Sequence, residues 1–402
     1  MKVCIYILLF SLLSLERQII FVHEISRHGA RSPQVPIPNN NCDDWPMGPM
    51  MLTPIEKRQH YILGRYYRDR YVNQMKLLDP EYNPNQIFVR STGINRTILS
   101  AFSQMMGFYG FSNKTLTDDE LPYAIPPLQL TIDPNIISRL GNQPMAYYQN
   151  RIPIHVFNHS NDSYYQDSCP YADAMLNYQF SISQDVKNIL SSKQSSINKM
   201  LTIYGYDPDK ISFDLMITII FSVPLCQFDQ RDCKLPNDVS IDINYLVITL
   251  WPYRQAINAT LTQMRTTSLF KEMIQTYDYA IKSSISSLAN RNALKGYFAF
   301  AHDDTLMTIG KSLKIPNILN NGIPLASSLI FEIHAQNDSP KNESDFTVDS
   351  YFNMKKIQIG NCPLDTCPYA VFKQAIQSTY INNSDILCRQ PIKVRTDYIR
   401  DN

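Results

Sequence analysis

Three short apolar runs along the chain share one pattern. Residues 17–26 (RQIIFVHEIS), 85–89 (NQIFV) and 296–301 (GYFAFA) are rich in β-branched and aromatic residues, which is typical of buried strands. Helical apolar spacing follows the second and third runs, in NRTILSAFSQMMGF and TLMTIGKSL. Charged and polar residues stand directly after each run, namely Arg27-His28-Gly29, Arg90-Ser91-Thr92 and His302-Asp303-Asp304. The pattern predicts an α/β sheet that gathers these three clusters along one edge, where open α/β folds bind their ligands.

The segment between the first two runs predicts an amphipathic helix. In residues 53–71 (TPIEKRQHYILGRYYRDRY), apolar side chains recur at helical spacing among charged ones. Pro54 stands where the first turn of a helix tolerates proline. We interpret His60, which lies on this helix, as a packing or capping residue rather than a catalyst.

The composition changes between about residue 115 and residue 239. Pro, Asn, Tyr and Ser become frequent, with helical patches such as residues 185–201 (DVKNILSSKQSSINKML). We therefore predict an α/β core of residues 16–114 and 240–402, interrupted by a mainly helical insertion of residues 115–239. Within it, His155 and His159 have the i,i+4 spacing of a metal pair on a helix, but no H-E-x-x-H motif or nearby third ligand accompanies them. A surface loop is the favoured interpretation.

The N-terminus has the pattern of a secretory signal. Residues 1–15 hold one lysine, a short apolar run and small residues near its end, and a buried N-terminal strand is the alternative. We find no second apolar run long enough to span a membrane, so the mature chain is expected to have no membrane span. A secretory route makes glycosylation credible at the Asn-x-Ser/Thr sites Asn113, Asn158, Asn161, Asn258, Asn342 and Asn382. Asn95 and Asn337 are disfavoured, and Asn95 is expected to stay unmodified.

The overall charge gives no sign of a polyanionic partner. Lys and Arg number 37 against 36 Asp and Glu, a formal net charge of +1. The sequence therefore predicts neither nucleic acid nor a membrane surface as a partner. The function is therefore inferred from the charged clusters that follow the three apolar runs.

The cysteines favour disulfides over zinc. Removal of a signal containing Cys4 leaves seven, Cys42, Cys169, Cys226, Cys233, Cys362, Cys367 and Cys388, an odd number that implies pairs and one leftover thiol. Their spacing suggests local bridges across CPLDTC (362–367) and CQFDQRDC (226–233). Neither spacing is C-x-x-C, and no second Cys/His pair stands at zinc-finger distance.

The charged clusters together match the needs of phosphoryl transfer. Guanidinium groups bind phosphate oxygens bidentately, so Arg27, Arg31 and Arg90 could surround a dianionic phosphate, which Gly29 would let the backbone approach. Neighbouring cations would depress the pKa of His28 and leave it neutral and nucleophilic. Asp303 could then protonate the departing alcohol. Such a scheme would run through a phosphohistidine, need no metal or other cofactor, and favour acidic pH if Asp303 must carry a proton.

Five stretches carry a family resemblance. RHGARSP (27–33) resembles the signature of the histidine phosphatase superfamily in its acid phosphatase branch, and VRSTGINRT (89–97) and FAHDDT (300–305) are similar to that branch's second and third motifs. LTPIEKRQHYILGRYYRDRY (52–71) and NNGIPLASSLIFEI (320–333) are similar to the lysosomal and prostatic type. The likeness runs from about Gln18 to Cys388 and is weakest in the central insertion.

The resemblance implies a phosphate monoesterase. The fold would be a mixed or parallel sheet flanked by helices, of the phosphoglycerate-mutase type, with a mainly α-helical inserted domain. His28 would be the nucleophile and Asp303 the proton donor, and the phosphate would be bound by Arg27, Arg31, Arg90 and His302. The family also implies a small-molecule phosphate monoester as partner, a possible homodimer, and a lysosomal or secreted location.

The resemblance also implies three disulfides. Two carry over, Cys169 with Cys388 and Cys362 with Cys367. The third would join Cys226 to a cysteine in the ASS stretch, where Ser327 and Ser328 stand instead. Cys233 lies close enough along the chain to replace that partner, and Cys42 would then be the leftover thiol.

The chain departs from the family pattern at two places beside the signature residues. Ala30 stands where this type often has Asp, and TGIN (92–95) replaces a TDVD stretch. We interpret these changes as altered specificity. Two alternatives to a general acid phosphatase stay open: a phytase-like or inositol-phosphate phosphatase, and a catalytically weak protein that binds phosphate esters.

Overall fold

A computed structural model describes residues 17–35, 45, 47–127, 133–228, 235–287, 290 and 292–392. The predicted signal, Cys42 and Cys233 lie outside these residues, as does the side chain of Cys226. The third predicted disulfide and the leftover thiol therefore fall outside the described part of the chain.

The described residues form one mixed sheet of eight strands. Its order is β3-β2-β4-β1-β5-β6-β7, with β8 paired to β6. The strands are β1 (Gln18–Arg27), β2 (Ile87–Ser91), β3 (His155–Val156), β4 (Gly296–Ala301), β5 (Ser328–Ala335), β6 (Phe346–Phe352), β7 (Lys355–Lys356) and β8 (Cys367–Pro368). The three strands predicted from the apolar runs are β1, β2 and β4, so the predicted α/β fold class is confirmed.

The register of these three strands explains why their ends meet. β4 lies between β1 and β2 and is parallel to both. Arg27 at the end of β1 stands opposite Ala301 at the end of β4, and Ser91 at the end of β2 stands opposite Phe300. The three predicted clusters therefore leave the sheet at the same edge. β5 and β6 continue the sheet as antiparallel strands on the other side of β1.

Helices account for most of the remaining regular structure. They are α1 (Pro54–Tyr67), α2 (Asn95–Tyr109), α3 (Pro134–Leu140), α4 (Pro170–Ile182), α5 (Gln184–Ser192), α6 (Gln194–Ile203), α7 (Phe213–Phe228), α8 (Asn237–Ala256), α9 (Ala259–Ser286), α10 (Asp303–Ser312), α11 (Pro316–Asn321), α12 (Tyr369–Gln377) and α13 (Ser384–Leu387). The helix predicted over residues 53–71 is α1, continued by a π-helical turn at Arg68–Gln74. His60 on α1 is completely buried, as a packing residue would be.

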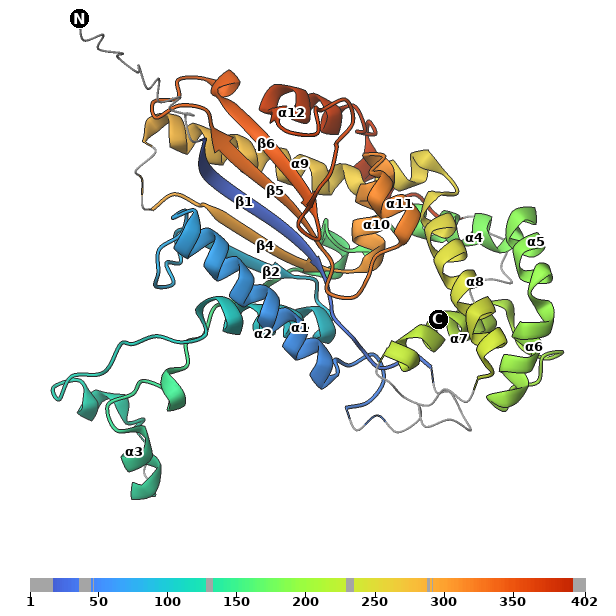
Figure 1. Cartoon of the computed structure of the whole chain (residues 1–402), viewed down its shortest axis with the longest axis horizontal. Coiled ribbons are helices and arrows are strands. Elements are labelled where there is room, and N and C mark those ends of the chain that lie inside the picture. Colours follow the sequence, from blue (N-terminus) through green and yellow to red (C-terminus); the bar gives the residue numbers. More distant parts are fainter. Residues whose placement is uncertain are drawn as a thin grey trace, which may run out of the picture.

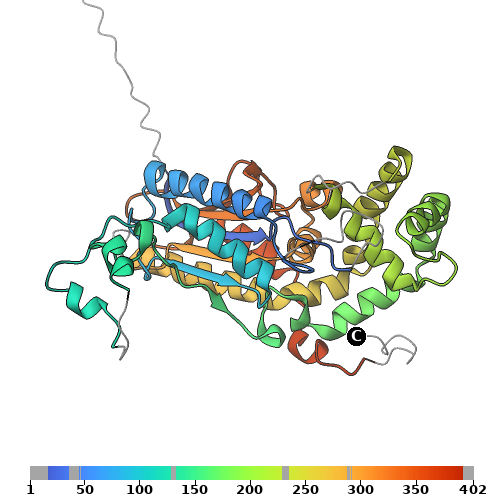
Figure 2. The same cartoon turned by 90° about the horizontal axis from the view of Figure 1, so that it is seen from below.

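Helices cover both faces of the sheet. Figure 2 shows α1 and α2 on one face and α9 on the other. Successive side chains of a strand point to opposite faces, so the same strands contribute to an apolar core on each side of the sheet. Val89, Phe298 and Phe300 pack with the α1–α2 layer. Phe21 and Ile25 pack with the α9 layer. Among the described residues, no helix is both long enough and apolar enough to cross a membrane.

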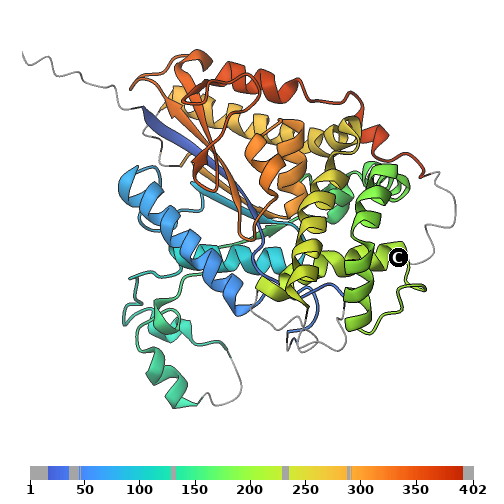
Figure 3. The ribbon, with the colours of Figure 1, turned by 45° about the vertical axis from the view of Figure 1, so that its right-hand side comes forward.

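A helical cap stands beyond the carboxyl ends of the parallel strands. It contains α4 to α8, to the right of the sheet in Figures 1 and 3, and has an apolar core of its own. α8 crosses the predicted boundary at residue 239, and its buried Leu246 and Leu250 belong to this cap core. We therefore propose the end of α8 as the boundary. The earlier part of the insertion, with α3, projects at the opposite end of the molecule (Figures 1 and 3).

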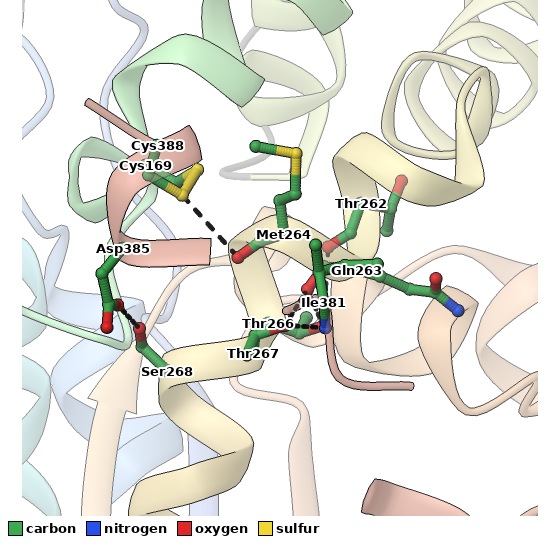
Figure 4. Close-up of a disulfide and its surroundings, with 10 residues drawn as sticks. All are labelled: Cys169, Thr262, Gln263, Met264, Thr266, Thr267, Ser268, Ile381, Asp385 and Cys388. Atoms are coloured by element: carbon green, nitrogen blue, oxygen red, sulfur yellow. Dashed lines mark hydrogen bonds between the residues drawn. A yellow bond between two sulfur atoms is a disulfide. The ribbon is translucent and has the colours of Figure 1, made fainter. Parts of the chain in front are cut away.

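Two disulfides join described residues. Cys169 is bonded to Cys388 and Cys362 to Cys367, the two pairs that the resemblance implies. The first connects the start of α4 to the C-terminal segment, 219 residues later. Figure 4 shows this segment lying along α9, where the amide of Ile381 donates to Thr267 and the hydroxyl of Ser268 donates to Asp385.

An ion pair at the buried Glu332, on the antiparallel half of the sheet, should account for part of the folding stability that the protein loses in acid. Arg70 donates two hydrogen bonds to the Glu332 carboxylate, at 2.8 and 2.9 Å, and the Tyr71 hydroxyl donates a third at 2.8 Å. Burial works against the charged form of Glu332. Hydrogen bonds from His334 and Arg70, with the Arg70 charge, outweigh burial and lower the pKa of Glu332 from 4.5 to about 2.

Glu332→Gln is expected to lower the free energy of unfolding by about 3 kcal/mol at pH 6, because Arg70 loses its buried partner. Since the folded-state pKa of Glu332 is depressed, its stabilisation is fully present above pH 4.5 and is lost as the pH falls towards 2. Denaturant titrations of the native protein and the variant should therefore show a smaller difference in unfolding free energy at pH 2.5 than at pH 6. Asp238→Asn, at an exposed pair with Lys199, serves as the control and should change little. If Glu332→Gln lowered the free energy of unfolding equally at both pH values, the stabilising ion pair between Glu332 and Arg70 would be contradicted.

Candidate active site

The site begins where β1 ends. His28 follows Arg27, the last residue of β1, and its side chain is buried. Its Nδ1 lies 2.8 Å from the carbonyl oxygen of Gly29. Because a carbonyl only accepts hydrogen bonds, Nδ1 carries the ring proton and Nε2 keeps its lone pair in the neutral ring.

The surroundings of His28 keep its ring neutral. Burial lowers the pKa of His28 well below 6.5, and the positive charges of Arg96 and Arg27, the nearby His302, and Arg31 lower it further. An imidazolium here would add another positive charge to a buried cationic cluster. His28 is thus available as a nucleophile at acidic pH as well as at neutral pH.

Three guanidinium groups lie close enough to His28 for their charges to lower its pKa. Arg27 ends β1, Arg31 lies in the signature stretch that follows, and Arg96 comes from the first turn of α2. Burial is the main reason that the pKa of Arg31 falls to about 9, and Arg96 and Arg27 lower it further. Burial also lowers the pKa of Arg96. Cations crowded in this way are stabilised by an anion, and the planar groups suit phosphate oxygens.

His302 and Asp303 stand at the start of α10, next to the arginines. Arg96 lies 3.3 Å from Nδ1 of His302, which therefore accepts, and Nε2 of His302 donates to the hydroxyl of Thr92 at 3.0 Å. Asp303 forms an ion pair with Arg27 at 2.7 Å and keeps 24% of its side chain exposed. The Asp303 carboxyl therefore lies at the partly exposed edge of the cationic cluster.

The structure does not bring Arg90 into this cluster. Its guanidinium is buried between the rings of Phe157 and Tyr164, and it forms ion pairs with Asp162 at 2.5 Å and Glu272 at 2.7 Å. The cause is strand alternation: Arg90 lies one residue before the end of β2 and points to the α9 face of the sheet, like Phe88. The predicted phosphate contact of Arg90 is corrected accordingly, because its charge is already matched by two carboxylates.

Sequence reasoning missed Arg96, although NRT was part of the second motif. One signal could have revealed it. The positive end of the helix dipole disfavours a cation in the first turn, where an acidic residue is preferred, and α2 has no acidic residue in that turn. An arginine in this first turn, five residues after the end of β2, is a candidate to bind an anion.

The floor of the signature loop is built from α1 and α2. A Cβ at Gly29 would stand 2.1 Å from Cγ of Glu56, so glycine is required by the approach of α1 rather than by the ligand. The Ser100 hydroxyl donates to Glu56 at 2.7 Å and accepts from the amide of Gly29 at 3.4 Å. Burial raises the pKa of Glu56 to about 7, against the hydrogen bond from Ser100.

The two histidines of the HVFNH stretch lie in different surroundings. His155 belongs to the edge strand β3, where its ring stacks on Phe88 with centroids 4.5 Å apart. His159 lies in a short 3₁₀ turn, with Nε2 3.2 Å from the carbonyl oxygen of Gly93. In the part of the chain that the structure describes, no group of three His, Cys, Asp or Glu side chains has the arrangement of a metal site.

Known proteins match this chain in sequence and in structure. Residues 18–204 match the family model described as "Histidine phosphatase superfamily (branch 2)". Lysosomal acid phosphatase of Xenopus laevis is 26% identical over 412 residues, covering 97% of this chain and 84% of the relative. Prostatic acid phosphatase of Bos taurus is 35% identical over 114 residues, a local match to 28% of this chain and 29% of the relative.

Solved structures share the fold across nearly the whole chain. The apo phytase of Hafnia alvei superposes with a TM-score of 0.60 at 15% identity, covering 93% of this chain and 99% of that chain. The phytase of Citrobacter braakii gives 0.59 at 15% identity, with 92% and 99% covered. At such identities the likeness establishes the fold alone. The sequence matches, rather than the fold, support membership of the histidine acid phosphatase family, whose relatives named here are phosphoric monoester hydrolases.

Proposed function

We propose that this chain hydrolyses phosphate monoesters through a phosphohistidine formed on His28. The observation that carries the proposal is a buried neutral imidazole, with its Nδ1 proton fixed on the Gly29 carbonyl, among three guanidinium groups. Such an arrangement holds a phosphate and a nucleophile together and offsets the charge that develops on the phosphoryl oxygens. Because the arginines supply the positive charge that offsets it, the scheme needs no metal or other cofactor.

The first step transfers the phosphoryl group to the enzyme. Nε2 of His28 attacks phosphorus, the bond between phosphorus and the ester oxygen breaks, and the proton of the Asp303 carboxyl passes to that oxygen. Arg27, Arg31 and Arg96 bind the phosphoryl oxygens, and His302, in contact with Arg96, belongs to the same pocket. The ion pair with Arg27 holds the Asp303 carboxyl beside the proposed phosphate site.

The second step releases phosphate. Water attacks phosphorus, the bond to Nε2 breaks, and the water proton passes to the Asp303 carboxylate. The same carboxyl thus acts first as an acid and then as a base. The names of the relatives and the predicted signal support a place in the secretory pathway, either lysosomal or secreted.

Asp303→Asn is expected to lower kcat for an aryl phosphate by about 100-fold, and by more for an alkyl phosphate, whose alcohol leaves only after protonation. The native enzyme should be most active in acid and lose activity towards neutral pH, and the variant should lose this dependence. The measurement is phosphate release between pH 4 and pH 8 with a chelator present. A native profile that stays flat to neutral pH, or a variant with equal losses on both esters, would contradict the role of Asp303.

A further inference from the structure

Side chains of α1 hold the backbone that carries the nucleophile. Gln59 accepts a hydrogen bond from the amide of Ala30 at 3.3 Å. Nε2 of His60 lies 3.2 Å from the carbonyl oxygen of Arg27, to which it can donate. A third side chain of this helix, Glu56, is used by no step of the reaction proposed above. Its carboxyl is completely buried, and its Oε2 has no hydrogen-bond partner within the part of the chain that the structure describes.

The hydroxyl of Ser100 decides which form of Glu56 fits this site. It has one hydrogen, yet two acceptors lie near it, Oε1 of Glu56 at 2.7 Å and the carbonyl oxygen of Arg96 at 2.9 Å. It also accepts a hydrogen bond from the amide of Gly29 at 3.4 Å. If Glu56 is ionised, the hydroxyl can donate to only one of the two acceptors. If Glu56 carries a proton, it donates to Ser100, Ser100 donates to Arg96, and all three contacts are made.

The surroundings of Glu56 also favour its neutral form. Burial raises the pKa of Glu56 to about 7, against the Ser100 hydrogen bond, the charge of Lys57 and the amide of Gly29. His60, 3.7 Å away, does not supply a compensating charge, because burial lowers its own pKa to about 4. A buried carboxylate with one oxygen unpaired is costly. The carboxyl of Glu56 is therefore protonated at the acidic pH at which the proposed reaction runs.

Ser100 joins the two segments that form the phosphate pocket. It holds the amide of Gly29, whose carbonyl fixes the Nδ1 proton of His28, and it contacts the first turn of α2, which carries Arg96. We propose that Glu56 is a positioning residue that acts in its protonated form, because its hydrogen bond to Ser100 holds the nucleophile's loop against the start of α2. The inference rests on the proposed function, since it explains how Nε2 of His28 is aligned with a phosphate bound at Arg96.

The first test measures kcat and KM for an aryl phosphate at acidic pH, with a denaturant titration of each variant. Glu56→Met keeps the length of the side chain but cannot donate a hydrogen bond, and Ser100→Ala removes the bridging hydroxyl. Each should lower kcat about 10-fold with a smaller change in KM, because His28 loses its alignment while the guanidinium groups remain. Glu56→Gln is neutral and can donate through its amide, so it should recover most of the native kcat.

Ser103→Ala provides the matched control on the same helix. The hydroxyl of Ser103 donates to the carbonyl oxygen of Leu99 at 2.9 Å, the same bond to the fourth residue before it that Ser100 can make to Arg96. Ser103→Ala therefore removes an equivalent helix contact while the bridge at Ser100 stays, and it should keep the native kcat.

The second test detects the proton itself. The infrared difference spectrum between native enzyme and Glu56→Gln at pH 5.5 should contain the carbonyl stretch of one protonated carboxyl, which should be lost at pH 8.5. A missing band at pH 5.5, native kcat in both Glu56→Met and Ser100→Ala, or a Glu56→Gln variant no more active than Glu56→Met would overturn the inference and leave the phosphatase assignment intact. If native enzyme releases no phosphate from the ester, the proposed function is wrong and the positioning role falls with it.

Discussion

His28→Ala is expected to lower kcat/KM for an aryl phosphate by at least about 10⁴-fold while the protein stays folded. The substitution removes the only atom proposed to bond to phosphorus. Because the buried imidazole is neutral, its removal leaves no partner charge unpaired, and the protein should stay folded. The measurement is initial rate together with a denaturant titration of the same preparation.

His155→Ala provides the matched control for the loss of an imidazole. Its ring stacks on Phe88 and lies on the edge strand β3, so activity should stay close to the native value. If His28→Ala retained more than a tenth of native activity in a folded protein, another residue would have to be the nucleophile.

Arg96→Ala is expected to lose activity, whereas Arg90→Ala is expected to lose stability. Arg96→Ala should lower kcat/KM by about 10²- to 10³-fold, as the loss of one preorganised charge contact does in other enzymes, with little change in stability. Arg90→Ala should instead lower the free energy of unfolding by about 3–5 kcal/mol, because Asp162 and Glu272 lose their shared cation.

The two outcomes are separated by measuring kinetics and unfolding for both variants. Arg90→Lys keeps the positive charge and guards against a variant that does not fold; it should recover part of the stability. The assignment would be contradicted if Arg90→Lys were stable but had lost phosphate binding, or if Arg96→Ala kept native kcat/KM.

The strand ends were predictable because they depend on local composition and on one general rule. Short runs rich in β-branched and aromatic residues formed β1, β2 and β4, and parallel neighbours brought their carboxyl ends together. The position of His28, His302 and Asp303 at one edge follows from that rule. The family signature adds the chemistry but is not needed to place them.

The assignment of individual arginines was not predictable from spacing. Arg90 and Arg96 both follow the same apolar run, and the sequence does not reveal that Asp162 and Glu272, 72 and 182 residues beyond Arg90, bind it on the α9 face. The same limit applies to Gly29 and Gly93. Each is explained by a side chain that only the tertiary structure brings near, Glu56 in one case and His159 in the other.

The most direct test of the account is to find where the phosphoryl group resides during turnover. Native enzyme is mixed with an aryl phosphate at acidic pH, quenched within milliseconds in alkali, which preserves phosphohistidine, and digested for mass spectrometry. We predict a burst that approaches one phosphoryl group per chain, on the peptide that contains His28. Rapid turnover with no phosphorylated histidine, or a phosphoryl group on a different residue, would contradict the proposed mechanism.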